Sequence, residues 1–280
     1  MKAATEYRSL AWDQLRANFK QSSIVVLISL LIGVIAFSSI FASVFYMLQS
    51  PSWLSGMIAA AVMSLMLLTT GLLGYYRPVW FMSMVRKQPE RWYDIRTPYM
   101  RALIASVFVI VPNVLSGLVN GMSQFVQHTD SISPTIKLVL ALIIFGFSLV
   151  VLAFTLWYSY SISIMLPLKV YDREERSVFG LIKETFQMMK GHRWQLFCVD
   201  FFIVVWPIIV IWFLSLVLGV VIGLHVANLI DGNVFLGAVV VTSVFLGAVF
   251  LVYLFLIAPM VHFAHVLFFE DLQEELINKN

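Results

Sequence analysis

The chain has 280 residues, of which 61% are hydrophobic and only 12% are charged, and its formal net charge is +3. Soluble domains contain about 45–50% apolar and about 25% charged residues, so a water-soluble fold of this length could not bury so much apolar surface. The composition excludes a soluble enzyme, a secreted disulfide scaffold and a free nucleic-acid-binding protein. It predicts an all-α, polytopic membrane protein.

Five stretches contain no Asp, Glu, Lys or Arg, and each is longer than the ~20 apolar residues that cross a bilayer. They are residues 21–76, 102–129, 138–168, 201–230 and 232–269. The first is long enough for two helices, and Pro51 with its polar neighbours divides it. The sequence therefore predicts six spans, near residues 23–48, 53–76, 102–127, 138–168, 194–223 and 234–269.

The basic residues predict the orientation of these spans. Seventeen of the 18 lysines and arginines lie in the N-terminal segment, in the loops at 77–101 and 169–193, and in the C-terminal tail, and the exception is Lys137. Positively charged loops are retained in the cytoplasm. The pattern predicts cytoplasmic N- and C-termini, and it fits six spans because one span more or fewer would mix the two faces.

Each pair of spans is preceded by a cytoplasmic amphipathic segment. The clearest is 172–190, where Val178, Leu181 and Thr185 share one helical face with other apolar residues. We expect Asp172 to cap this helix and Gly191 to end it. Such a helix is predicted to lie at the headgroup boundary. Weaker versions are residues 7–19 and the irregular stretch 86–99.

The basic residues of these segments are expected at the membrane interface. They are Arg86, Lys87, Arg91, Arg96, Arg176, Lys183, Lys190 and Arg193. Two interpretations stay open. Either these residues bind anionic lipid headgroups, or they only set the topology while Trp and Tyr side chains anchor the spans.

The sequence predicts a single membrane domain, residues 1–280, that contains three repeats of one structural unit. The predicted repeats are the hairpin units 1–76, 77–168 and 169–280. A proline lies near the cytoplasmic end of each returning helix, at Pro78, Pro167 and Pro259, with separations of 89 and 92 residues. Because each unit contains two spans, the units share one orientation, which predicts pseudo-threefold packing about the membrane normal.

Two rising helices carry a second shared pattern. Pro112 and Pro207 are each followed by a Gly-x-x-x-Gly pair, Gly117 with Gly121 and Gly219 with Gly223. The five prolines are predicted helix kinks, either purely structural or opening a cytoplasm-facing cavity. The glycines are expected to allow close helix approach.

Ionisable side chains are rare inside the predicted spans. Asp200 and His262 both lie ~10–12 Å below the cytoplasmic boundary at 1.5 Å rise per residue. We expect Asp200 to reach His262 or His265, because an unpaired carboxylate at that depth is costly. The contact is either a ligand or gating site or a structural hydrogen-bonded pair. Asn113 is a weaker candidate, as are Asn120 and the serines at 159, 161 and 163.

Catalytic and metal-binding motifs are missing from the sequence, so no enzyme, cofactor or metal site is predicted. There is no phosphate-binding loop and no His-Glu-x-x-His pattern. His262 and His265 could share a metal, but no third ligand is evident beyond Asp200. The single cysteine, Cys198, lies in an apolar run and cannot form an intramolecular disulfide.

Residues 188–197 read Met-Met-Lys-Gly-His-Arg-Trp-Gln-Leu-Phe. This run resembles the uncharacterised bacterial membrane-protein family known as domain of unknown function 975. There, Met-Lys-Gly-His-(Lys/Arg)-Trp precedes a span beginning Leu-Phe-x-Leu-x-Leu-Ser-Phe-Ile-Gly-Trp. Here Ile203 and Trp206 are kept, whereas the Ser and Gly are absent.

Both ends of the chain also fit that family. Residues 11–19 fit its opening pattern, Ala-x-x-x-Leu-x-x-Asn-aromatic, and its closing pattern is similar to Pro259, Ala264, Phe268, Phe269, Glu270 and Leu272, with Met260 in place of a Tyr. The resemblance implies a six-span protein of the bacterial cytoplasmic (inner) membrane. It implies no activity and no catalytic residue.

The expected function is therefore that of a non-enzymatic module in the membrane. It would bind lipid or another amphiphile, with anionic headgroups as one expected class, or scaffold other membrane proteins. The alternative is a secondary transporter or exporter with a polar site near Asp200 and His262. No nucleic-acid partner is expected.

Overall fold

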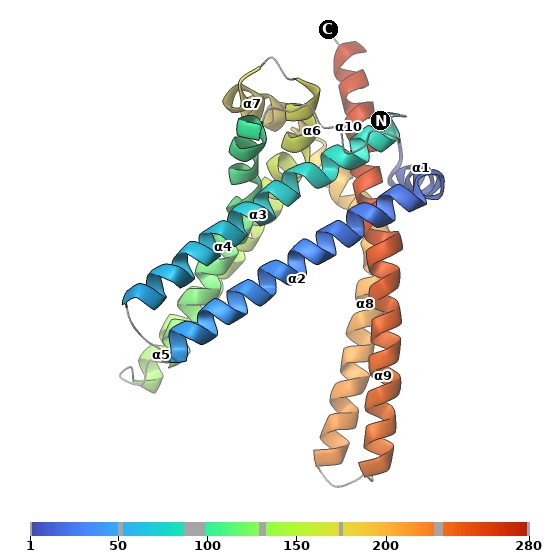
Figure 1. Ribbon diagram of the computed structural model, residues 1–280. Helices are drawn as coiled ribbons and strands as arrows, with labels where there is room; N and C mark the ends of the chain where they lie inside the picture. The colour runs from blue at the N-terminus through green and yellow to red at the C-terminus, as the bar shows by residue number, and fades with distance from the viewer. Residues whose placement is uncertain are drawn as a thin grey trace. The chain divides into compact units, whose positions relative to one another are not determined.

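The computed structural model describes residues 2–49, 53–86, 99–128, 133–173, 176–226 and 232–278, and within these ranges the chain is helical and contains no strand (Figure 1). In chain order the elements are α1 (Ala4–Ala17), α2 (Phe19–Gln49), α3 (Trp53–Val85), α4 (Tyr99–His128), α5 (Pro134–Tyr158), η2 (Ser159–Ser163), α6 (Met165–Asp172), α7 (Val178–Met188), α8 (Arg193–Val226), α9 (Gly232–Val252), η3 (Tyr253–Ile257) and α10 (Ala258–Asn278). The predicted all-α class is confirmed.

Five helical stretches of the described residues are long and apolar enough to cross a membrane. They are Phe19–Tyr46, Trp53–Val85, Tyr99–Ser123, Thr135–Asp172 and Val239–Asn278. They coincide with the predicted spans one, two, three, four and six. The fifth predicted span coincides with α8, whose side chains are described only in part, and it stays a prediction.

The predicted fourth and sixth spans each contain a π-helical turn. In η2, Ile164 N–H donates to the carbonyl of Ser159, five residues back, at 3.2 Å. Proline pushes away the carbonyl four residues before it. For Pro167 and Pro259 that residue lies in η2 and η3, respectively. A π-helical turn widens the backbone at this point and accommodates the ring.

The other three prolines behave differently. Pro78 and Pro112 lie inside α3 and α4, and α8 continues through position 207. Span two was predicted to end at residue 76, but α3 runs on to Val85. The reason is that the residues after Pro78 are buried in the protein and pack as a helix, as Phe81 and Met82 do.

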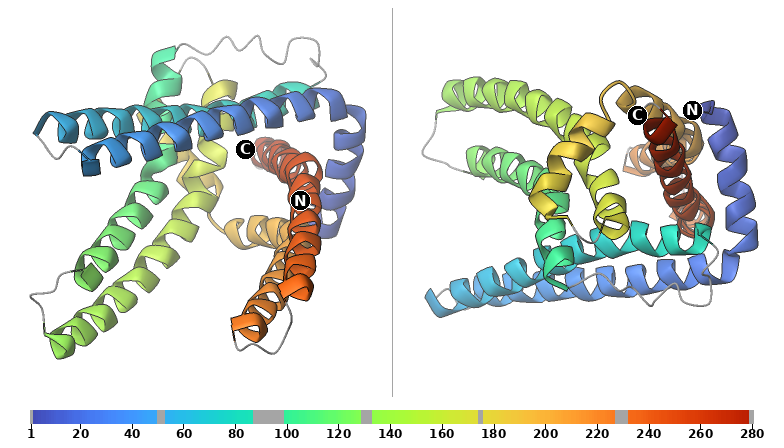
Figure 2. Two further views of the ribbon diagram at one scale, coloured as in Figure 1. Left: turned by 60° about the horizontal axis from the view of Figure 1, so that its bottom comes forward. Right: turned by 90° about the horizontal axis from the view of Figure 1, so that it is seen from above.

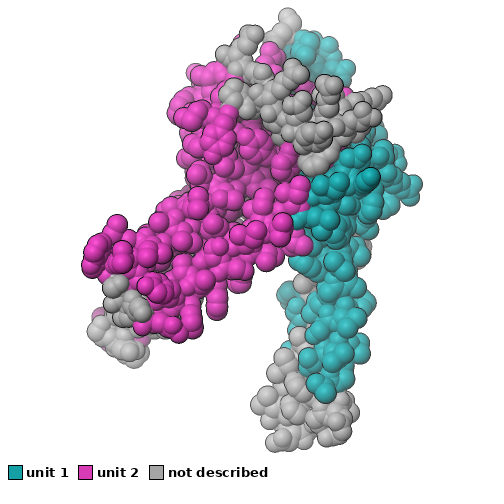
Figure 3. All heavy atoms as spheres, viewed as in Figure 1, with its two compact units in different colours: residues 1–27, 194–280 teal, residues 28–193 magenta. Residues whose placement is uncertain are grey.

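The chain divides into two compact units, coloured separately in Figure 3: unit 1 comprises residues 1–27 and 194–280, and unit 2 comprises residues 28–193. This division does not follow the three predicted hairpin units, which stay a prediction.

Unit 2 is built on the close approach of α3 and α4. A Cβ added at Gly71 would lie 2.7 Å from Ile110 Cγ2 and 3.0 Å from the carbonyl oxygen of Ser106. Only glycine lets the two backbones come this close. The same helices then continue into a buried apolar cluster, whose members include Tyr75, Val79, Ala102, Ala105, Tyr158, Ile162, Leu166, Val170, Val178 and Leu181.

Three of the glycines that the sequence singled out for close approach contact no other helix among the described residues. A Cβ at Gly117, Gly121 or Gly219 would meet no described atom within 4 Å, so the expected close approach is not found within this part of the chain. Gly117 and Gly121 instead line an apolar groove of about 480 Å³ between α4 and α5. The surroundings of Gly223 are not among the described parts of the structure.

The amphipathic helix α7 packs on the buried apolar cluster of unit 2. Its apolar face, with Val178, Leu181 and Thr185 buried, packs on the cluster just described. The sequence predicted that this helix lies at the headgroup boundary, which stays a prediction, and the structure shows that protein side chains cover its apolar face. An amphipathic pattern indicates that a helix buries one face, but it does not indicate whether protein or lipid covers that face.

The ends of α7 differ in part from the prediction. The N-cap is Ser177, whose Oγ accepts a hydrogen bond from the Gly180 N–H at 3.3 Å, and not Asp172. Asp172 ends α6 and pairs with Arg86 at 2.9 Å. Gly191 follows the helix with a φ of +89°, a conformation that glycine adopts without steric cost.

Unit 1 joins the two ends of the chain. The helix α1 lies beside α10 in both views of Figure 2, and it buries Tyr7, Ala11 and Leu15. The ring of Tyr7 lies 5.5 Å from that of Phe268. The hairpin of α8 and α9 belongs to the same unit (Figure 1).

Candidate functional site

Asp200 and His265 form a hydrogen-bonded pair inside unit 1. His265 Nε2 lies 2.6 Å from Asp200 Oδ1, and the two side chains are only 8% and 16% exposed. This confirms the predicted contact between α8 and the returning helix. The ring of His262 lies edge-on to that of His265, with centroids 6.3 Å apart.

The pair meets the need of a carboxylate in apolar surroundings for a polar partner. The imidazole either donates a hydrogen bond in its neutral form or makes an ion pair when protonated. No three His, Cys, Asp or Glu side chains converge anywhere in the described ranges. The arrangement can therefore hold a proton or fasten two helices, and it lacks the third ligand that a metal would need.

A groove of about 830 Å³ opens in unit 1 beside this pair. Its floor is apolar and comes from α8, α9, η3 and α10: Phe202, Ile203, Phe245, Ala248, Val249, Val252, Ile257 and Met260. Its rim is formed by Arg8, Ser9 and Trp12 of α1. An apolar groove with a cationic and aromatic rim suits a molecule that has an apolar tail and a polar head.

Three polar contacts fix α1 at the rim of this groove. Lys2 Nζ lies 2.6 Å from Asp271 Oδ1 and 2.9 Å from Oδ2. The Tyr7 hydroxyl donates to Asp271 Oδ2 at 2.9 Å, and Gln195 Nε2 donates to the carbonyl of Lys2 at 2.9 Å. The pKa of Tyr7 is raised mainly by burial and also by the hydrogen bond to Asp271. Its hydroxyl therefore stays protonated, and so a hydrogen-bond donor, over the physiological pH range.

Sequence reasoning singled out neither the rim residues nor Asp271. The amphipathic pattern of residues 7–19 indicated that α1 buries one face. However, Tyr7 and Asp271 are separated by 264 positions, and no local signal shows which distant helix α1 covers.

Arg193 is held in unit 2. Its guanidinium lies over the ring of Trp157, 4.9 Å from the centroid, and its Nε donates to Ser161 Oγ at 2.5 Å. Ser161 belongs to the π-helical turn η2 and in turn donates to the Trp157 carbonyl at 2.8 Å. Arg193 was predicted as an interface residue, which stays a prediction; the structure shows its side chain held against Trp157 and Ser161.

The remaining predicted interface residues fall into three groups. Arg86 pairs with Asp172, and Arg176 pairs with Glu184, which also lies 3.5 Å from Lys169. Burial alone would raise the pKa of Glu184, but these two cations outweigh it and hold that pKa below its usual range. In the second group, Lys183 and Lys190 are exposed. Lys87, Arg91 and Arg96 lie outside the described residues.

The weaker polar candidates lie in unit 2. Asn113 is exposed on α4. Ser163 donates to the Val109 carbonyl at 3.4 Å. The side chain of Asn120 lies outside the described residues. Of the described candidates, Ser161 is joined to the charged side chain of Arg193.

The chain matches no protein-family model, no curated protein and no solved structure. The similarity of residues 188–197 to a bacterial membrane-protein family therefore stays a prediction.

Proposed function

We propose that the protein is a non-enzymatic membrane protein that binds a lipid-like amphiphile in the groove of unit 1. The observation that supports this is the groove itself, which is apolar along its floor and carries Arg8 and Trp12 at its rim. Its volume of about 830 Å³ lies within the roughly 300–1,000 Å³ of small-molecule sites. An acyl chain would cover the apolar floor, and the polar head would lie at α1.

The proposal includes six spans, with the basic segments in the cytoplasm of a bacterial inner membrane. Five apolar stretches of sufficient length and the uneven distribution of lysine and arginine support it. The helix α8, 34 residues long and without acidic residues in its first turn, would be the sixth span.

We also propose the threefold repeat as the architecture behind the groove. Two observations support it. The π-helical turns η2 and η3 both precede a proline of a returning helix. In addition, α7 covers the returning helix of the second hairpin, and α1 covers that of the third. Each amphipathic helix would then cover the hairpin of the preceding repeat. For α1, which belongs to the first repeat, the preceding repeat in a threefold arrangement is the third.

The test is lipid retention by the purified protein. Ala248 lines the groove, and Ala248→Trp would fill it; Ser243→Trp adds the same ring at an exposed position of α9 outside the groove. We expect Ala248→Trp to lower the amount of lipid that copurifies, measured by native mass spectrometry, and Ser243→Trp to leave it unchanged. Equal retention by all three proteins would refute the proposal.

A second candidate function is secondary transport, which the Asp200–His265 pair favours because acidic side chains inside spans often carry protons. Its test is flux in proteoliposomes under a proton gradient. Transport predicts that Asp200→Asn abolishes a measurable substrate-dependent proton flux. Absence of such a flux in the unaltered protein across a panel of lipophilic cations and amphiphiles would remove this candidate.

A further inference from the structure

The helix α1 carries a cationic face beside the groove. We propose that this face selects an amphiphile with an anionic, phosphate-bearing headgroup, namely an anionic phospholipid, held between Arg8 and Arg16 on either side of Trp12. The inference rests on the proposed function and adds to it the chemical class of the ligand.

Arg8 is the first observation. It lines the groove, and within the described part of the chain its guanidinium makes no hydrogen bond and no ion pair. Other basic residues of the cytoplasmic side are paired: Lys2 with Asp271, Arg86 with Asp172 and Arg176 with Glu184. Arg8 is therefore available for an anion, and its planar fork of donors matches the oxygens of a phosphate.

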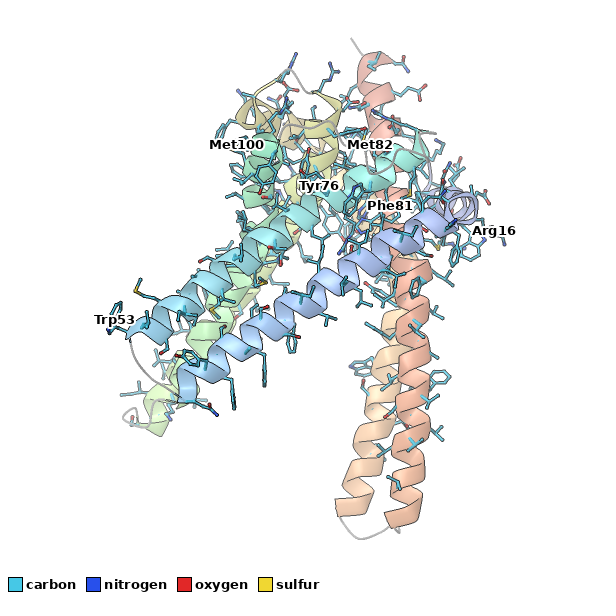
Figure 4. All side chains as sticks on the ribbon, in the orientation of Figure 1. Arg16, Trp53, Tyr76, Phe81, Met82 and Met100 are labelled. Carbon is cyan, nitrogen blue, oxygen red and sulfur yellow. The ribbon has the colours of Figure 1, made fainter. Side chains whose placement is uncertain are left out.

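Arg16 is the second observation. Its guanidinium lies over the Trp12 ring, 5.0 Å from the centroid, and Figure 4 labels it on α1. Residues at i, i+4 and i+8 follow one side of a helix, so Arg8, Trp12 and Arg16 form a row. A tryptophan at the headgroup level, flanked by two arginines, combines an interfacial anchor with two cations.

The acidic residues of α1 lie away from Arg8. At 3.6 residues per turn, Glu6 and Asp13 share a side of the helix about 140–160° from Arg8. The buried face with Tyr7, Ala11 and Leu15 lies on the other flank of Arg8. Arg8 therefore borders the apolar face of α1 and is separated from its carboxylates. Arg16 lies further round the helix and is a neighbour of Asp13, three residues before it.

The row is also held in place before any ligand binds. Lys2 and Tyr7 fasten the first turns of α1 to Asp271, and Gln195 holds the carbonyl of Lys2. A fixed α1 lowers the entropy that headgroup binding would otherwise cost.

The experiment is competitive lipid binding, measured by native mass spectrometry of the full chain in a micelle that contains equal amounts of phosphatidylglycerol and phosphatidylcholine. The test variant is Arg8→Gln/Arg16→Gln. The matched control, Lys183→Gln/Lys190→Gln, removes the same number of charges from exposed positions in and after α7. Inorganic phosphate is added in a separate arm, because a site for free phosphate would share the same donors.

We expect the unaltered protein and the control to prefer phosphatidylglycerol by about thirtyfold, the effect of two basic residues near a headgroup. The double arginine variant should keep its total bound lipid and lose the preference. Arg8→Lys/Arg16→Lys should restore part of it, because charge is kept and the planar fork is lost. Added phosphate should displace no phospholipid.

Three results would overturn the inference: no preference in the unaltered protein, an unchanged preference in the arginine variant, or an equal loss in the lysine control. Displacement by inorganic phosphate would assign the arginines to a free anion and would likewise overturn it. The proposed function fails separately, if Ala248→Trp retains as much total lipid as the unaltered protein.

Discussion

Asp200 and His265 meet at 2.6 Å and join α8 to α10, the rising and returning helices that enclose one side of the groove. Phe202 and Ile203, which line the groove, lie two and three residues after Asp200 on α8, and Met260 lies five residues before His265 on α10. The pair therefore joins the two helices next to the part of the groove floor that Phe202, Ile203 and Met260 form.

Removal of the carboxylate should weaken unit 1. Asp200→Leu leaves His265 without its acceptor, and an unsatisfied buried polar group costs about 1–3 kcal/mol. Asp200→Asn keeps a hydrogen-bonding group of the same shape and should cost less. The measurement is the midpoint of thermal unfolding in detergent, with Asp13→Leu at an exposed position of α1 as the control. If Asp200→Leu unfolds at the same temperature as the unaltered protein, the pair does not stabilise the helices.

The close approach of α3 and α4 predicts a specific intolerance in unit 2. The Cβ of Gly71→Ala would collide with Ile110 and press on the Ser106 carbonyl, so we expect a loss of about 1–3 kcal/mol from overpacking. Gly117→Ala meets no described atom within 4 Å and should be neutral or slightly stabilising, because alanine has the higher helix propensity. Thermal unfolding of the two variants side by side tests this. Equal effects of the two substitutions would show that α3 and α4 do not pack at Gly71.

The attachment of α7 should depend on pH. The pKa of Glu184 is lowered in the folded protein because Arg176 and Lys169 outweigh the effect of its burial. A lowered folded-state pKa gives a stabilisation that is present above the unfolded-state value and is lost as the pH falls through the folded-state value. We therefore expect weaker protection of the α7 amides, relative to their intrinsic exchange rate at each pH, below the ordinary glutamate range, and a smaller loss of protection in Glu184→Gln. An equal loss of protection with acid in both proteins would contradict this.

Topology can be tested by cysteine labelling in a Cys198→Ser background. Six spans place Lys183 and Asn278 in the cytoplasm and Lys137 on the opposite face. A cysteine at 137 should react with a membrane-impermeant maleimide in intact cells, and cysteines at 183 and 278 only after permeabilisation. Labelling of positions 183 and 278 on opposite faces would mean that α8 and the helix after it do not both cross the membrane.

The spans could be predicted from the sequence because lipid requires long runs without charge. The predicted bounds of spans one and three agree with α2 and α4 to within about one helical turn. The turns η2 and η3 were missed, because a proline in an apolar run predicts a disturbed helix without showing whether the backbone bends or widens. The Asp200–His265 contact was predictable because helices joined by a short loop pack together and both side chains lie at one depth.

The groove could not be predicted, because it depends on contacts between the two ends of the chain. Arg8 and Trp12 become rim residues only when Tyr7 packs on Phe268 and Lys2 pairs with Asp271. Likewise, Ser177 and Asp172 are both short polar residues that suit an N-cap. Asp172 instead ends α6, where it meets Arg86, a residue 86 positions earlier.

The most direct test of the groove is photocrosslinking of the purified protein with phosphatidylglycerol that carries a photoactivatable acyl chain, followed by peptide mapping. If the groove holds the lipid, adducts will concentrate on Phe202, Phe245 and Met260, and unlabelled phosphatidylglycerol will compete them away. Adducts spread evenly over outward-facing side chains of the spans, such as Trp212 and Phe213, with no competition, would contradict the account.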